Sequence, residues 1–357
     1  MNNQPNLFDE FTPTGEQEWL EKVVVDLKGK SIEALGRTVG EDIAISPFHH
    51  ADSATAPTGP LNANRANNQW EIAENFTLNQ DLSITNKAIL HALENGTEAI
   101  QIRIDRLLSQ ADMKTLFQDI EPGYISTHFH FLDNDHILDT MTAFAEITKE
   151  KKTVKPGFRG SVSTEEQEIN DALITWGKTA LPNFKMWTVI NEKTEPVQSL
   201  LELIKAGMQG ATKAAGNTIT SNLVFHVTIE TDYFTEIARL RALRILWANV
   251  LKSTGHDPLL LPQIAVVIKP DPTTDPNQNL IRATTMAMSA AIGGADRITI
   301  IPETSGDTSV RYTRMARNLQ HILRMESFLD RVVDPAAGSY YVETLTNRFS
   351  EAVWDQL

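Results

Sequence analysis

From Trp70 onward, short runs of alternating apolar and polar residues are separated by stretches with helical spacing. Each run predicts a strand, and the runs are 69–76, 98–105, 124–131, 158–165, 184–190, 223–230, 263–269 and 296–302. Helices are predicted between most of them, at 86–94, 136–150, 196–208, 231–251, 279–292 and 308–326. This rhythm predicts an α/β protein with a (β/α)8 TIM barrel. A doubly wound open sheet is the alternative, but no glycine-rich phosphate loop follows the first strand.

The residues before the first strand have a different pattern. A helix opening at Thr14 or Gly15 carries Trp19, Leu20 and Val23 on one face, and a loop of small and polar residues follows near residue 60. This stretch has no core of its own. We therefore expect residues 1–66 to form an N-terminal helical arm and extended segment, and residues 67–357 to form the barrel, with an incomplete last helix.

The strands are apolar on one face and polar on the other. Helices cover the outside of a barrel, so the polar faces are expected to point inward. The candidate interior residues are Gln101, Arg103, Ser126, His128, His130, Arg159, Ser161, His226, Thr228 and Glu230. They are candidates for a barrel-interior site, and no residue is assigned a catalytic role.

Charged residues inside a barrel must be paired or hydrated. The basic residues Arg103, Arg159, Lys269 and Arg297 are accordingly expected to meet Asp105, Glu165 and Glu230, or to be wetted. Three arrangements follow from the pattern. The interior is a polar channel for a long ligand, or it is closed by a network of salt bridges and histidines, or the polar faces lie open to solvent on a one-sided sheet.

Histidines on the strands also allow a metal site. His128 and His130 share one strand face, and Glu230 could add a carboxylate to form a zinc or iron site. Without a firm third ligand nearby, ordinary hydrogen-bonded histidines are the better interpretation. We expect no metal site.

Composition narrows the classes of partner. The chain has 357 residues, of which 41% are hydrophobic and 22% are charged, which is typical of a soluble globular protein. The 46 acidic and 32 basic residues give a net charge of −14, without a basic run for nucleic acid. There is no cysteine, and no apolar stretch is long enough to span a membrane. The first residues have neither the basic nor the apolar region that is typical of a signal peptide. A cytoplasmic location is expected, with neither nucleic acid nor membrane as partner.

Near the C-terminus, residues 314–343 read as an amphipathic helix followed by a turn. Leu319, Ile322 and Leu323 keep helical spacing, and Gly338 allows a turn before Tyr340 to Val342, which favour a strand.

Three segments together resemble the adenosylcobalamin-dependent methylmalonyl-CoA mutase family. They are YFTEIARLRALRILWANV (233–250), NLIRATTMAMSAAIGGADRITIIP (279–302) and RMARNLQHILRMESFLDRVVDPAAGSYYVE (314–343). Their order and spacing are specific, and residues 18–37 look like the short arm of that family's small subunit. The resemblance implies a barrel whose axis takes the coenzyme A chain, with cobalamin against its C-terminal mouth. Its chemistry is a radical rearrangement of the acyl skeleton.

Two departures from the family pattern limit which functional residues of the family can be assigned to this chain. Catalytic chains have a Tyr-His pair at the end of the strand that aligns with residues 184–190, and this chain reads MWTVIN there, without a histidine. The Asp-x-His-x-x-Gly motif that ligates cobalamin is absent from the sequence. The resemblance therefore implies the small, non-catalytic subunit of a heterodimeric mutase, which converts methylmalonyl-CoA to succinyl-CoA. Adenosylcobalamin would belong to the complex and not to this chain alone.

The expected partner is a catalytic large subunit, or a second copy when the chain is isolated, and acyl-CoA binding is possible. One alternative is a stand-alone acyl-CoA-binding barrel. Another is a catalytic barrel whose cobalamin domain lies on a separate chain, in which His130 or His226 would have to contact the substrate.

Overall fold

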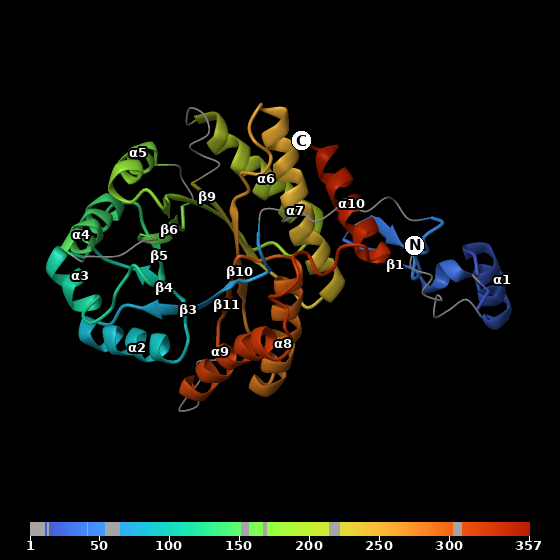
Figure 1. The fold of residues 1–357 in the computed structure, drawn as a ribbon, viewed down its shortest axis with the longest axis horizontal. Coiled ribbons are helices and arrows are strands. Elements are labelled where there is room, and N and C mark those ends of the chain that lie inside the picture. Colours follow the sequence, from blue (N-terminus) through green and yellow to red (C-terminus); the bar gives the residue numbers. More distant parts are fainter. Residues whose placement is uncertain are drawn as a thin grey trace, which may run out of the picture.

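A barrel of parallel strands with an outer layer of helices forms the body of the molecule (Figure 1). The computed structural model describes residues 11–12, 14–40, 42–53, 65–150, 157–166, 170–213, 222–302 and 309–357. Within these ranges the large sheet has the order β7-β6-β5-β4-β3-β11-β10-β9-β8. Its strands are β3 (Glu71–Thr77), β4 (Ala99–Ile104), β5 (Ser126–Phe131), β6 (Arg159–Thr164), β7 (Phe184–Lys185), β8 (Trp187–Asn191), β9 (Leu223–Thr228), β10 (Gln263–Ile268) and β11 (Arg297–Ile300).

The barrel closes through two different junctions. The last strand, β11, pairs in parallel with the first, β3. The fifth strand is broken at Met186, so that β7 pairs with β6 while β8 pairs with β9. The Thr188 hydroxyl donates a hydrogen bond to the carbonyl oxygen of Val162 at 2.7 Å, across the gap between β8 and β6. Counting β7 and β8 as one strand, the fold is the predicted (β/α)8 barrel, and the open-sheet alternative is wrong.

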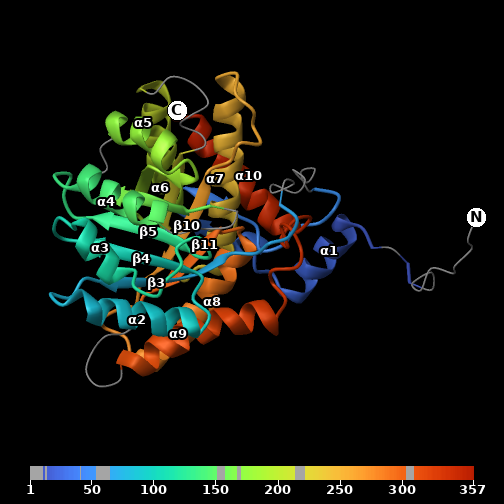
Figure 2. The same cartoon turned by 60° about the vertical axis from the view of Figure 1, so that its left-hand side comes forward.

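The outer helices lie against the apolar faces of the strands (Figures 1 and 2). They are α2 (Leu82–Glu94), α3 (Gln110–Leu116), α4 (Ile137–Glu150), α5 (Asp171–Ala180), α6 (Pro196–Lys213), α7 (Tyr233–Ser253), α8 (Pro276–Ile292), α9 (Ser309–Met325) and α10 (Tyr340–Trp354). The six predicted helices are present, but α3 and α5 were not predicted. Both are short, and side-chain caps mark their starts: Ser109 forms a capping box with Asp112, and Asn170 caps α5.

The apolar core lies between the strands and the helices, not on the barrel axis. Outward residues such as Ile102, Phe129 and Phe225 are fully buried under the helices. Helix α7 is buried almost all round because α6, α8 and α10 pack against it. The core therefore leaves the axis to the polar side chains of the strands.

The N-terminal residues form α1 (Glu16–Asp26), the 3-10 helix η1 (Ile32–Leu35) and a small antiparallel pair, β1 (Arg37–Val39) and β2 (Ile43–Ile45). Val39 and Ile45 join the core cluster of the barrel, while α1 has no buried residue. In both views α1 stands to one side of the barrel. Trp19 stacks on Phe48 with the ring centroids 3.6 Å apart.

The segment before α10 differs from the prediction. Residues Tyr340 to Val342 begin a helix, not a strand, because Gly338 turns the chain at φ 83° and Ser339 takes the N-cap position. Tertiary packing of Val342 and Leu345 overrides the β propensity of the two tyrosines.

No helix in the described ranges is both long enough and apolar enough to cross a membrane.

Candidate functional site

The N-terminal half of the barrel axis is closed by a network of charged and polar side chains, which we call the axial plug. It consists of Glu71, Ser126, His128, Arg159, Ser161 and Arg297. Four of these are the first residues of β3, β5, β6 and β11, and the parallel register pairs Arg297 with Glu71 and Ser126 with Arg159.

Every charged member of the axial plug has a polar partner. Arg159 Nε donates to Ser126 Oγ at 2.8 Å and lies 3.4 Å from a carboxylate oxygen of Glu71. Ser126 also donates to Glu71. His128 Nδ1 lies 2.8 Å from Ser161 Oγ and also meets the Arg297 guanidinium. The plug therefore places one carboxylate among two guanidinium groups and one imidazole.

Burial and neighbouring charges shift the pKa values of three residues in the axial plug. Burial, together with the charge of Arg297, lowers the pKa of His128 to about 4. Burial also lowers the pKa of Arg297 to about 10. For Glu71, burial acts to raise the pKa, but the hydrogen bond and charge of His128, with Ser126 and Arg297, outweigh it, so its pKa is lowered. Near neutral pH the plug holds ionised Glu71 and Arg297 beside a neutral imidazole.

The C-terminal half of the axis is a cavity of about 610 Å³, which we call the mouth cavity. Its volume is in the range of small-molecule sites. Polar and charged side chains of the strands, of the residues that follow them and of α9 make up much of its lining: Glu74, Asn75, Thr77, Gln101, Arg103, His130, Glu165, Glu192, His226, Thr228, Lys269, Arg317 and Gln320.

Most charges around the mouth cavity are paired. Glu74 pairs with Arg317, and Glu192 pairs with Lys269. His130 Nε2 lies 3.2 Å from Glu165 Oε1, and its Nδ1 lies 3.0 Å from Ser163 Oγ.

The candidate residues fall into three places. Gln101, Arg103, His130, His226 and Thr228 line the mouth cavity. Ser126, His128, Arg159 and Ser161 belong to the axial plug. Glu230 lines neither, and lies with Asp271 and Arg282 in an adjoining cavity of about 360 Å³.

The expected ion pairs were wrong in detail. Arg159 meets Glu71, and Lys269 meets Glu192, while Asp105 pairs with Arg106 beside it in sequence. Sequence reasoning missed Glu71. Glu71 shares one face of the first strand with Ala73 and Asn75, and this period of two was the signal that could have placed it inside the barrel.

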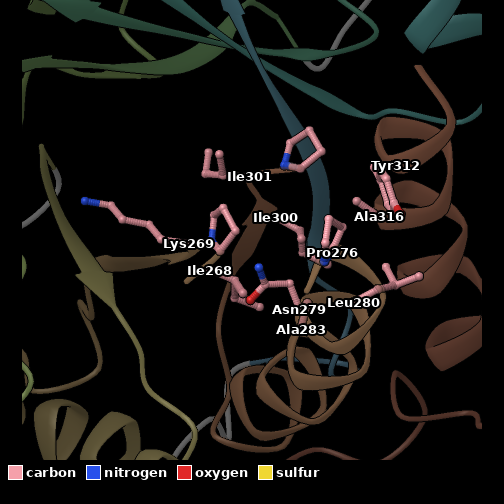
Figure 3. A pocket seen from close by; sticks show the side chains of 12 residues that line it. Ile268, Lys269, Pro276, Asn279, Leu280, Ala283, Ile300, Ile301, Tyr312 and Ala316 are labelled. Carbon is pink, nitrogen blue, oxygen red and sulfur yellow. The ribbon is translucent and has the colours of Figure 1, made fainter. Parts of the chain in front are cut away.

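A smaller pocket lies beside the mouth cavity, between the ends of β10 and β11 and helices α8 and α9 (Figure 3). It is lined mainly by apolar groups, such as Ile268, Leu280 and Ile300, and encloses about 20 Å³. The Lys269 side chain extends away from it. This space is about the size of one water molecule, so it is a packing gap and not a ligand site.

His130 does not fit the role of a cobalt ligand. An axial ligand needs a free ring nitrogen at the rim, and both nitrogens of His130 are already engaged. Burial lowers the pKa of His226 to about 3, with the charge of Arg297 adding to the effect.

The chain is a (β/α)8-barrel protein whose axis is closed at the N-terminal end by charged side chains and open at the C-terminal end. The open end holds a ligand-sized cavity, and barrel enzymes place their sites at this end. The family model for methylmalonyl-CoA mutase matches residues 197–357. Over that part of its length the chain is similar to the methylmalonyl-CoA mutase family.

Its relatives include three proteins named methylmalonyl-CoA mutase small subunit. That of Porphyromonas gingivalis is 29% identical over 392 aligned positions, covering 98% of this chain and 63% of the relative. That of Streptomyces virginiae is 40% identical over 139 residues, covering 38% of this chain and 23% of the relative. The Mycobacterium bovis protein, named as a probable small subunit, is 27% identical and covers 80% of this chain and 52% of the relative. The chain thus spans less than two thirds of the length of each.

Buried His128 and half-buried His226 should make the barrel acid-sensitive. Their pKa values, about 4 for His128 and about 3 for His226, lie below the ordinary 6.5, so the unfolded chain binds these protons first. Stability is then full above pH 6.5 and falls as the pH drops toward 4, by up to about 1.4 kcal/mol per pH unit for each histidine.

Urea unfolding of the wild type and of His226→Gln between pH 7 and pH 4 tests this expectation. Between pH 6.5 and pH 4, the free energy of unfolding of the variant should fall less steeply with pH than that of the wild type. The exposed His91 on α2 provides the control, and His91→Gln should keep the wild-type slope. Equal slopes for the wild type and His226→Gln would contradict the assignment.

Proposed function

We propose that this chain is the small subunit of an adenosylcobalamin-dependent methylmalonyl-CoA mutase, with a structural role and not a catalytic one. The mutase interconverts methylmalonyl-CoA and succinyl-CoA, and a large subunit would carry the chemistry. The observation that carries the proposal is the alignment with the Porphyromonas gingivalis small subunit across 98% of this chain.

The axial plug supports a structural role. In the family's catalytic barrels the coenzyme A chain is expected to run along the axis, and here Glu71, His128 and Arg297 occupy it. Opening that path would separate a half-buried carboxylate from the half-buried Arg159 and the buried Arg297, which costs free energy. The strand end at Thr188 to Asn191 also lacks the substrate histidine of catalytic chains.

Adenosylcobalamin, in this proposal, is held by the complex through the large subunit. It supplies the radical chemistry there. Residues of this chain contribute only a stable surface beside it.

The N-terminal arm, residues 1–66, is the proposed contact with the large subunit, and residues 67–357 are the proposed barrel domain. Helix α1 is only 11 residues long and has no buried residue, although Trp19, Leu20 and Val23 share one half-buried face. Isolated helices of this length are marginal in water, so a partner surface would stabilise it. Arg37 fixes the base of the arm to the barrel through Asp232, at 2.8 Å.

Turnover measured with and without the large subunit tests the proposal. The purified chain, given adenosylcobalamin and methylmalonyl-CoA, should form no succinyl-CoA, while the co-purified pair should be active. Activity of the chain alone would support the alternative of a catalytic barrel with a separate cobalamin domain. Binding of acyl-CoA thioesters in calorimetry, with no association with a large subunit, would support the stand-alone acyl-CoA barrel.

Replacing Trp19 by alanine tests the arm in the same system. Loss of the ring's stacking and apolar contact should weaken association with the large subunit by roughly tenfold or more, since tryptophans dominate many interfaces. Trp354→Ala is the control, because Trp354 is 43% exposed on α10, outside the arm. Unchanged affinity in Trp19→Ala would move the contact elsewhere while leaving the subunit assignment to the turnover assay.

A further inference from the structure

The mouth cavity combines one unpaired cation with several unused hydrogen-bonding groups. Arg103 lines the cavity at the end of β4 and has no ion-pair or hydrogen-bond partner among the described residues. The other basic side chains of the cavity, Lys269 and Arg317, each have a carboxylate partner.

The groups around Arg103 come from three strands. In the parallel register, Asn75 lies opposite Gln101 and Thr77 lies opposite Arg103, so β3 and β4 present four polar side chains in two adjacent rows. His226 faces the same cavity from β9. Gln101 is 8% exposed, yet neither its amide nor the imidazole of His226 has a hydrogen-bond partner within the described ranges.

A buried amide or imidazole without a partner is costly in a dry interior. These groups keep contact with a cavity large enough to hold a ligand, so a bound molecule can satisfy them. The closed axis also limits what enters, because the cavity is blocked below by the axial plug. A long chain therefore cannot pass through the axis, and the part of a ligand that lies inside the mouth has a cavity of about 610 Å³.

We propose that the mouth cavity binds a small monocarboxylic acid that carries further hydroxyl or keto oxygens. Arg103 receives the carboxylate, because a guanidinium offers two parallel N–H donors to its two oxygens. Gln101, Asn75 and His226 meet the hydroxyl or keto groups. One unpaired cation matches one negative charge, which favours a carboxylate over the more highly charged phosphate. This site does not depend on the proposed partnership with a large subunit.

Calorimetric titration of the full chain with lactate, pyruvate and gluconate, each up to millimolar concentration, tests the site, with inorganic phosphate as the charge control. At least one of the three acids should bind, and Arg103→Gln should weaken that binding by roughly tenfold or more, because the charged fork is lost. Arg103 has no ion-pair or hydrogen-bond partner among the described residues, so the variant should retain the wild-type melting temperature.

Arg106→Gln is the matched control, since Arg106 lies three residues further on and outside the cavity lining. Its affinity should stay within about twofold of the wild type, as expected for a guanidinium outside the site. His226→Gln gives a second arm, in which binding should weaken while the carboxylate contact stays. Three results would each overturn the proposal: no binding by any of the acids, equal binding by Arg103→Gln, or tighter binding of phosphate than of every acid.

Discussion

Replacing Arg241 by methionine should lower the free energy of unfolding by about 3 to 5 kcal/mol, the largest effect expected for a single substitution outside the axis. Arg241 lies on α7 with its side chain 2% exposed. Its Nε donates to Asp334 at 2.9 Å, and one terminal nitrogen donates to Glu343, also at 2.9 Å. Without the guanidinium, two buried carboxylates would face each other with no cation.

This ion triad joins the end of the chain to the barrel. Asp334 lies in the turn before α10, where it adopts φ 49°, and Glu343 lies in the first turn of α10. Glu343 also accepts a hydrogen bond from the backbone N–H of Gly338 at 3.0 Å. The triad therefore holds both the turn and the start of α10 against α7, and its loss should loosen α10 first.

Urea unfolding followed by circular dichroism measures the effect. Lys149→Met is the control, because Lys149 forms an exposed pair with Glu146 on α4 at 2.6 Å, and such pairs contribute at most about 1 kcal/mol. A loss below about 1 kcal/mol in Arg241→Met would mean that the triad is no more stabilising than a surface pair.

Replacing Glu71 by glutamine should have the second largest effect and lower the free energy of unfolding by roughly 2 kcal/mol or more. Hydrogen bonds to charged groups contribute about 1.5 to 3 kcal/mol. The side chain keeps its shape but no longer balances Arg159 and Arg297. Because Glu71 is a quarter exposed, the loss should be smaller than for Arg241.

The pH dependence separates this effect from simple packing damage. The pKa of Glu71 is lowered in the folded state, so its stabilising contribution is complete above the ordinary pKa of a glutamate and is lost as the pH falls through the folded value. The difference between wild type and Glu71→Gln should therefore shrink in acid.

Glu165→Gln is the matched control for Glu71→Gln. Glu165 also pairs with a strand histidine, His130, but its side chain is 55% exposed. Its substitution should cost less than about 1 kcal/mol. If both variants lost the same stability, the axial plug would not be a special buried network.

Much of the barrel could be predicted from local pattern alone. Alternation along the strands depends only on the two-residue period of extended backbone, so the order of residue types is enough to locate the inward rows that contain Gln101, Arg103 and His128. Helices with strong apolar periodicity, such as α4 and α9, were predicted nearly to their ends. The short helices α3 and α5 were missed, since seven to ten residues carry too few apolar repeats to be distinctive.

The pairing of charges could not be predicted in the same way. Which carboxylate meets Arg297 depends on the stagger between strands that are far apart in sequence, and Glu71 reaches it only because β11 pairs with β3. Likewise, Glu230 lies two residues after the end of β9, yet it lines an adjoining cavity and not the mouth cavity.

The sequence by itself determined the alternation, the repeat of strand and helix, the family resemblance and the missing substrate histidine, because each of these is a property of residue type and spacing. Only the tertiary structure decided that the axis is closed below and hollow above. That result depends on where side chains from different strands meet, and register and barrel closure set those meetings. The same closure left Arg103 as an unpaired cation in the mouth cavity, among the residues that the structure describes.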